Sequence, residues 1–150
     1  EDCIYEVHGS IHYLQCIKPC KEKIWENNFN IEIDFNTMRA KNIPRCKYCG
    51  DVVRPNILMF GDFSWVSLRA DEQSERFNRY VDRIGGNDVV ILEIGAGKAV
   101  PTIRYLAKRT ADITGATIVR INPVEYEIEE PHIPIKGKAL DVLSLINENI

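Results

Sequence analysis

The sequence lacks any apolar run long enough to cross a membrane. Its longest apolar stretches have the length of single strands, far below the roughly 20 residues that a membrane-spanning helix needs. The segment from Glu1 to Tyr5 has neither a basic leader nor an apolar run of the kind found in targeting signals. We therefore expect a cytoplasmic protein without a membrane partner.

A strong net charge is also missing. The 150 residues carry a formal net charge of −3, and the sequence contains no repeat and no low-complexity tract. Such a chain has no global attraction to phosphate backbones or anionic lipid, so we expect no direct nucleic-acid partner. Its 45% hydrophobic and 27% charged residues are typical of a globular protein that can bury one sizeable core.

Cysteine is scarce but patterned. Cys3 stands alone, whereas the other four cysteines form two close pairs, Cys16 with Cys20 and Cys46 with Cys49. Two thiolate pairs on separate turns are typical of a tetrahedral zinc site that is closed by four sulfur ligands. The alternative is four reduced thiols that never meet, because the first pair and the gap between the pairs are both wider than usual. We favour a structural zinc, which stabilises a fold and leaves no open position for catalysis.

The first half of the chain predicts little regular structure. Alternation over Ile11–Cys16 predicts a short strand, and the polar segment Lys21–Arg45 predicts an irregular excursion between the cysteine pairs. The apolar run Ile57–Phe60, which is closed by Gly61 and Asp62, predicts a buried strand that ends in a turn.

The second half alternates between strand and helix patterns. Asp71–Ile84 has helical periodicity and ends at a pair of glycines. Further strands are expected at Val89–Ile94, Ala116–Ile121 and Ile133–Ile135, and further helices at Pro101–Arg109 and Ala139–Ile146. Continuous apolar strands that alternate with helices indicate an α/β, Rossmann-like parallel sheet with helices on both faces, to which a small four-cysteine zinc module is added.

Three short motifs are candidates for chemistry, and each has an ordinary alternative. Gly95-Ala96-Gly97 follows a buried strand and precedes a helix, where a nucleotide can approach the backbone, but such a turn is often only a turn. Asn122 ends the next strand, where open α/β sheets bind ligands, although Asn-Pro is itself a common turn. His8, before Gly9, is a candidate general base, whereas a lone histidine is more often a simple hydrogen-bonding residue. His12 and His132 keep that simpler interpretation.

In their order along the chain, these motifs resemble the sirtuin family. The resemblance rests on His8-Gly9, the two cysteine pairs, Arg54-Pro55, Phe60-Gly61-Asp62, Gly95-Ala96-Gly97, Asn122 and Gly137-Lys138-Ala139. It covers essentially the whole chain, and the stretch from Arg54 to Asp62 is most similar to a bacterial branch. The resemblance implies a catalytic histidine loop at residues 1–10, a zinc module at 11–56, and the carboxy-terminal half of an NAD-binding domain at 57–150.

The resemblance also implies an activity, the NAD-dependent removal of acyl groups from protein lysines with release of nicotinamide and O-acyl-ADP-ribose. His8 is then the general base that helps to deprotonate a ribose hydroxyl of NAD. The acyl-lysine peptide pairs with the segment made of Ile57, Leu58, Met59, Phe60, Gly61 and Asp62. The adenosine half of NAD is held by Gly95, Ala96, Gly97, Asn122 and Lys138, and structural zinc is held by Cys16, Cys20, Cys46 and Cys49.

The sequence departs from the family pattern in three places. Gly95-Ala96-Gly97 stands where most sirtuins have Gly-Thr-Ser, so backbone amides must replace hydroxyl contacts there. Asp62 stands where glutamate is commoner. The glycine-rich phosphate loop and the Gln-Asn-x-Asp motif that precede the histidine in sirtuins are missing, which leaves an apolar sheet edge exposed. We expect a chain trimmed at its amino end, and the alternative is a small protein completed by a partner that supplies these strands.

The resemblance leaves other functions open. NAD hydrolysis and protein ADP-ribosylation are possible on the same fold, and both release nicotinamide without an acylated peptide. A zinc-stabilised binding module without catalysis is the alternative from another class, and in such a module His8 has no catalytic role.

Overall fold

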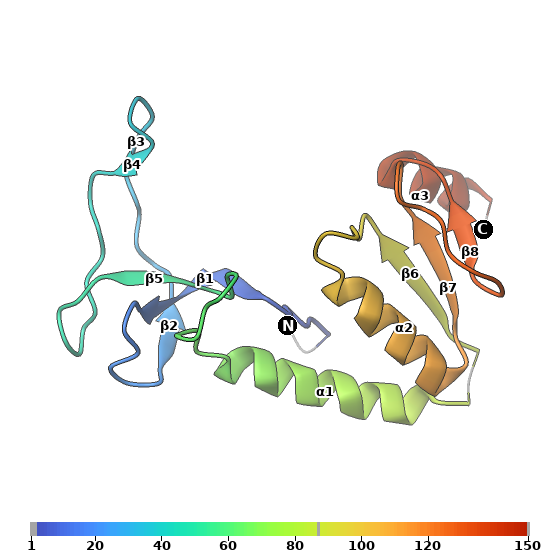
Figure 1. Ribbon diagram of the computed structural model, residues 1–150, viewed down its shortest axis with the longest axis horizontal. Coiled ribbons are helices and arrows are strands. Elements are labelled where there is room, and N and C mark those ends of the chain that lie inside the picture. Colours follow the sequence, from blue (N-terminus) through green and yellow to red (C-terminus); the bar gives the residue numbers. More distant parts are fainter. Residues whose placement is uncertain (1–2, 87, 150) are drawn as a thin grey trace. The chain divides into compact units, whose positions relative to one another are not determined.

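The computed structural model describes residues 3–86 and 88–149, and the chain divides between Phe77 and Asn78 into two compact units. Figure 1 shows the elements in chain order. They are β1 (Gly9–Cys16), β2 (Ile24–Glu26), β3 (Ile33–Asp34), β4 (Arg39–Ala40), β5 (Val53–Ile57), α1 (Leu68–Ile84), β6 (Val90–Ile94), α2 (Thr102–Thr114), β7 (Thr117–Ile121), β8 (Ile133–Ile135) and α3 (Ala139–Glu148). No helix among the described residues is long and apolar enough to span a bilayer.

The first unit is built on an antiparallel sheet with the strand order β2-β1-β5. Its core consists of Leu14, Cys16, Cys46 and Val53, with Trp25 packed against them. Two of these residues are zinc-ligand candidates, so the core and the predicted metal site share side chains. The segment between the cysteine pairs has only the short β2 and the hairpin β3–β4, in agreement with the predicted irregular excursion.

The strand predicted at Ile57–Phe60 is wrong. The strand β5 runs from Val53 to Ile57, and the chain then leaves the sheet in a turn at Phe60 and Gly61. Met59 is 58% exposed and Phe60 is 91% exposed, so the apolar run is not a buried strand in this unit. A short apolar run does not by itself establish a buried strand, because its pattern is ambiguous over so few residues.

The helix α1 spans the boundary between the units and begins three residues before its predicted start at Asp71. The Ser67 carbonyl accepts the first helical bond from the Asp71 N–H at 2.9 Å, and the Ser67 hydroxyl donates to the Asp71 carboxylate at 2.6 Å. A serine that bonds into the first turn is a typical helix start. The first turns of α1 belong to the first unit, where Gln73 accepts a hydrogen bond from the Glu6 N–H.

The second unit contains the parallel sheet that the alternation of strands and helices predicted. Its strand order is β6-β7-β8, and β6 and β7 pair without irregularity from Val90 and Thr117 to Ile94 and Ile121. The helix α2 lies along β6 and β7 (Figure 1) and buries Ala107 and Ala111 against Ile118. α2 continues past its predicted end at Arg109 and stops before Gly115, which has the left-handed φ of 76° that favours glycine.

The strand β6 lies at an edge of the described sheet and carries an uncovered apolar face. Val90, Leu92 and Ile94 point to one side and are 63%, 51% and 43% exposed. On the other side, Glu93 forms a buried ion pair with Arg120 of β7. The described part of the chain therefore has an exposed apolar strand at the edge of this sheet.

Candidate functional site

The four paired cysteines meet at one point in the first unit. Their sulfur atoms all lie within 4.8 Å of one another, with 3.6 Å between Cys16 and Cys49 and 3.7 Å between Cys20 and Cys46. Sulfurs bound tetrahedrally to zinc at about 2.3 Å lie about 3.8 Å apart, so the spacing fits this metal. The predicted convergence is confirmed, and the cluster is suited to structural zinc.

The local backbone prepares the cluster for a cation. The pKa of the Cys46 thiol is lowered to about 7, mainly by a hydrogen bond from the Tyr48 backbone N–H. Burial acts in the opposite direction and raises this pKa, whereas a hydrogen bond from the Cys49 backbone lowers it further. Hydrogen bonding to Cys49 is the main cause that raises the pKa of Cys20 to about 12. One thiol of the set therefore gives up its proton near neutral pH, and the others must lose theirs when a metal binds.

The predicted catalytic histidine lies in a turn that is tied to the predicted substrate segment. The turn closes through the Gly9 N–H, which donates to the Glu6 carbonyl at 2.9 Å, and the Leu58 N–H donates to the His8 carbonyl at 2.9 Å. Gly9 has a φ of 79°, and a Cβ atom on it would lie 2.1 Å from the Asn56 carbonyl oxygen. Only glycine permits this close approach, which brings His8 beside the residues that follow β5.

The six predicted substrate residues form one stretch that starts at this contact. Ile57 ends β5, Leu58 is bonded to His8, and Met59 and Phe60 extend into solvent. Asp62 closes the stretch through a 2.6 Å ion pair with Arg54, whose side chain is 13% exposed. Burial raises the pKa of Asp62, but the hydrogen bond and charge of Arg54 outweigh it, so the pKa lies below its usual value.

The predicted nucleotide residues come together in the second unit, at the carboxyl ends of its strands. The Gly95 N–H donates to the Ile121 carbonyl at 3.0 Å, and the Asn122 side chain donates to the Ala96 carbonyl at 3.3 Å. The Gly137 N–H donates to the Asn122 carbonyl at 3.4 Å, which places Lys138 next to the same group at the start of α3. This is the edge at which open α/β sheets bind ligands.

The turn Gly95–Gly97 fits a nucleotide in two respects. Gly95 has a φ of 69° and open space where a side chain would be, so a ligand can approach its backbone. The helix α2 starts at Thr102 after Pro101, and no side chain of Pro101 caps its first N–H groups. The N–H groups at a helix start favour an anionic ligand such as a phosphate.

Two residues around this turn were not predicted from the sequence. The Arg104 guanidinium donates to the Ala96 carbonyl from Nε at 3.0 Å and from Nη2 at 2.8 Å, and it also reaches the Glu125 carbonyl at 2.6 Å. The Glu125 carboxylate accepts the Lys98 N–H at 2.7 Å. Both are ordinary charged residues with no local motif, and only the fold brings them together around the glycine turn.

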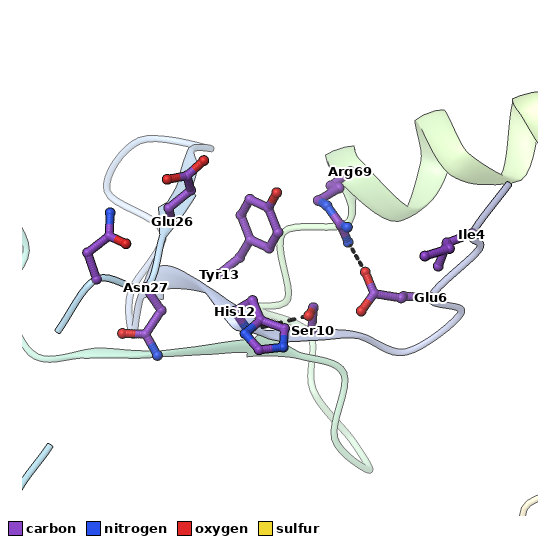
Figure 2. A pocket seen from close by; sticks show the side chains of 9 residues that line it. Ile4, Glu6, Ser10, His12, Tyr13, Glu26, Asn27 and Arg69 are labelled. Carbon is purple, nitrogen blue, oxygen red and sulfur yellow. Dashed lines mark hydrogen bonds and ion pairs between the residues drawn. The ribbon is translucent and has the colours of Figure 1, made fainter. Parts of the chain in front are cut away.

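One further pocket lies in the first unit beside the histidine turn (Figure 2). It has a volume of about 360 Å³. Its lining residues are mostly polar and comprise Ile4, Glu6, Ser10, His12, Tyr13, Glu26, Asn27, Asn28 and Arg69. Glu6 is ion-paired with Arg69, and the guanidinium carbon of Arg69 lies 4.3 Å from the Tyr13 ring centroid. Burial raises the pKa of Glu6, but its bonds with Arg69 outweigh this and lower it, so Glu6 stays ionised. None of the predicted site residues lines this pocket.

Comparison with known proteins gives consistent matches. The family model described as the Sir2 family matches residues 1–100. The chain is 28% identical to an NAD-dependent protein deacylase of Thermococcus kodakarensis over 93% of this chain and 50% of that protein. It is 24% identical to NAD-dependent protein deacetylase 2 of Caldanaerobacter subterraneus subsp. tengcongensis over 91% of this chain and 47% of that protein.

Solved structures give the same fold. A mutant of a Sir2 homologue in complex with ADP-ribose superposes with a TM-score of 0.61 and 21% identity, over 97% of this chain and 51% of that one. A Sir2 homologue in complex with NAD superposes with a TM-score of 0.56, also at 21% identity, over 95% of this chain and 49% of that one. The chain spans about half the length of the curated relatives it matches.

Proposed function

Because the chain belongs to the Sir2 family, we propose that the protein containing it is an NAD-dependent protein-lysine deacylase. The observation that carries this proposal is the bond between the His8 carbonyl and the Leu58 N–H, which ties a candidate general base to a candidate peptide-binding segment. The names of the relatives support the same activity, since several are NAD-dependent protein deacylases or deacetylases. The acyl-lysine side chain of a protein or peptide is the proposed substrate.

In this proposal, His8 acts as the general base. Bound NAD supplies a ribose from which nicotinamide leaves and whose hydroxyl must lose a proton. An imidazole is suited to accept that proton near neutral pH. The turn supports this role because it is closed at Gly9 and tied to Leu58, so the position of His8 is set by backbone bonds on both sides.

The peptide is proposed to bind along the stretch that follows β5. An extended peptide can pair with free backbone groups of such a segment, while apolar side chains line the path of the acyl-lysine. Among the backbone bonds described for this stretch, the Leu58 N–H donates to the His8 carbonyl and the Asp62 N–H donates to the Met59 carbonyl. We therefore propose that the peptide pairs with the backbone N–H and C=O groups around Phe60. The exposed Met59 and Phe60 side chains supply the apolar surface.

The adenosine half of NAD is proposed to bind at the glycine turn of the second unit. The Asn122 side-chain nitrogen donates to the Ala96 carbonyl of this turn, and its oxygen accepts the Val124 and Glu125 N–H groups of the loop that follows Asn122. Backbone N–H groups then replace the hydroxyls that the motif Gly-Thr-Ser supplies in most sirtuins. Lys138 lies at the same edge and offers a cation to the ligand.

The test is nicotinamide release from NAD by the purified natural protein, with and without an acetyl-lysine peptide. We expect release only when the peptide is present, and loss of that release in His8→Ala with the zinc content unchanged. His12→Ala is the matched control, because His12 lies on the neighbouring strand β1 and is expected to leave the activity intact. Release without peptide would favour NAD hydrolysis or ADP-ribosylation, and no release under either condition would favour a non-catalytic binding module.

A further inference from the structure

We propose that Gln15 and Asn56 are positioning residues that set the affinity for the acyl-lysine peptide by holding the segment Leu58–Val66, here called the substrate loop. This inference rests on the proposed function and extends it to two residues that lie outside the candidate site. Both residues are buried, with Gln15 0% and Asn56 2% exposed.

The substrate loop needs external support. The phenylalanines of its tip extend into solvent, with Phe60 91% and Phe63 101% exposed, so they contribute no packing that would fix the tip, whereas Val66 at the far end is only 6% exposed. Within the loop, the Asp62 N–H donates to the Met59 carbonyl at 3.2 Å and the Ser64 N–H donates to the Asp62 side chain at 3.0 Å. A binding surface of exposed apolar groups keeps one shape only when its backbone is held from outside.

Gln15 supplies much of that support. Its side-chain N–H₂ donates to the Ser64 carbonyl at 2.7 Å and to the Cys16 carbonyl at 3.4 Å, and its side-chain oxygen accepts the Val66 N–H at 3.0 Å. One amide therefore binds the far end of the substrate loop through both a donor and an acceptor. Because the amide is fully buried, water cannot replace either bond.

Asn56 completes the network. Its side-chain nitrogen donates to the Gln15 oxygen at 2.9 Å and to the Val66 carbonyl at 2.8 Å. Both polar groups of the Val66 backbone are thus bound by this pair of amides. The near end of the loop is held separately by the bond from the Leu58 N–H to the His8 carbonyl, so the loop is fixed to the histidine turn at one end and to β1 and β5 at the other.

The Gln15 side chain lies on the opposite face of β1 from the core side chains Leu14 and Cys16. Side chains alternate along β1, so Leu14 and Cys16 enter the core while Gln15 points to the other face, toward the loop. Apart from the 3.4 Å bond to the Cys16 carbonyl, the bonds of the Gln15 side chain go to the substrate loop and to Asn56, so a change at Gln15 acts mainly on the loop. This separation is what makes a positioning role distinguishable from a general loss of stability.

The experiment compares Gln15→Glu and Gln15→Met with the unaltered natural protein. Glutamate keeps the shape of the glutamine side chain, but an oxygen replaces the N–H₂ group that donates to Ser64 and Cys16. Methionine removes every hydrogen bond of the amide without adding a charge. Asn42→Asp is the matched control, since Asn42 makes the same kind of amide bonds, to Glu32 and Asn30, in the exposed β3–β4 region. For each protein we would measure the KM for an acetyl-lysine peptide, the KM for NAD, kcat, and the rate of chymotrypsin cleavage after individual phenylalanines.

We expect either Gln15 variant to raise the peptide KM about tenfold, which corresponds to about 1.4 kcal/mol, while the KM for NAD and kcat change by less than about twofold. Cleavage after Phe60 and Phe63 should accelerate, and cleavage after Phe35, which is 79% exposed in the β3–β4 region, should not. In Asn42→Asp, cleavage after Phe35 should accelerate, whereas cleavage after Phe60 and Phe63 and the peptide KM should stay unchanged. Because two chemically different variants are compared, failure of one to fold leaves the other to decide.

Two results would overturn the inference. One is an unchanged peptide KM together with unchanged cleavage after Phe60 and Phe63. The other is a parallel loss of kcat and of both affinities, which indicates unfolding rather than positioning. If the unaltered protein shows no peptide-dependent turnover, the proposed function fails, and the cleavage rates alone then support or refute the holding of the loop.

Discussion

Replacement of Gly9 by alanine tests the contact on which the histidine turn depends. Gly9 combines a left-handed φ of 79° with a Cβ position only 2.1 Å from the Asn56 carbonyl oxygen, about 1.3 Å short of ordinary contact. The left-handed conformation alone costs an alanine about 1–2 kcal/mol. Relief of the overlap requires β1 and β5 to separate where Gly9 pairs with Ile57, and forced shifts of this kind cost about 1–3 kcal/mol more.

Gly61→Ala is the matched control for this prediction. Gly61 has a similar φ of 67° in the same unit, but nothing lies within 4 Å of its Cβ position. We therefore expect Gly9→Ala to lower the free energy of unfolding by about 3 kcal/mol and Gly61→Ala by only about 1–2 kcal/mol. Urea unfolding followed by tryptophan fluorescence reports on this unit, since both tryptophans, Trp25 and Trp65, lie within it. Equal losses for the two variants would refute the close approach of Gly9 to Asn56.

Two further predictions concern the zinc site and the ion pair that closes the substrate stretch. Cys16→Ser should reduce bound zinc from one equivalent per chain to none and unfold the first unit, because Cys16 is both a ligand candidate and a core residue; metal analysis together with tryptophan fluorescence checks this. The folded-state pKa of Asp62 lies below its ordinary 3.8, so the stability from its pair with Arg54 is fully present above pH 3.8 and is lost as the pH falls through the folded pKa. The difference in unfolding free energy between the natural protein and Asp62→Asn should therefore be constant at neutral pH and shrink in acid, and a difference that grows in acid would contradict this sign.

Local patterns were sufficient for the elements whose signals lie close together in the sequence. The cysteine pairs predicted their own convergence, and the strands and helices of the second unit lie near their predicted positions. The helix α2 extends beyond its predicted end at Arg109 because Thr110, Ala111 and Thr114 continue its buried face up to Gly115, whose left-handed φ of 76° ends the helix. Small residues such as Ala111 give a weak apolar signal in the sequence, although the fold buries them.

Contacts between distant residues account for what the sequence could not show. Gln15 and Asn56 are 41 residues apart, and nothing in either local segment marks a polar side chain as buried. The ion pair of Glu93 and Arg120 spans 27 residues and requires the parallel register of β6 and β7. The apolar run after Ile57 was misassigned for the opposite reason, because its local pattern is that of a buried strand although its side chains face solvent.

Nicotinamide release that depends on an acylated peptide is the direct test of whether the protein is a lysine deacylase. With NAD and the purified natural protein, we expect release that starts on addition of an acetyl-lysine peptide and disappears in His8→Ala but not in His12→Ala. Release that is the same with and without the peptide, or that survives in His8→Ala, would contradict this expectation.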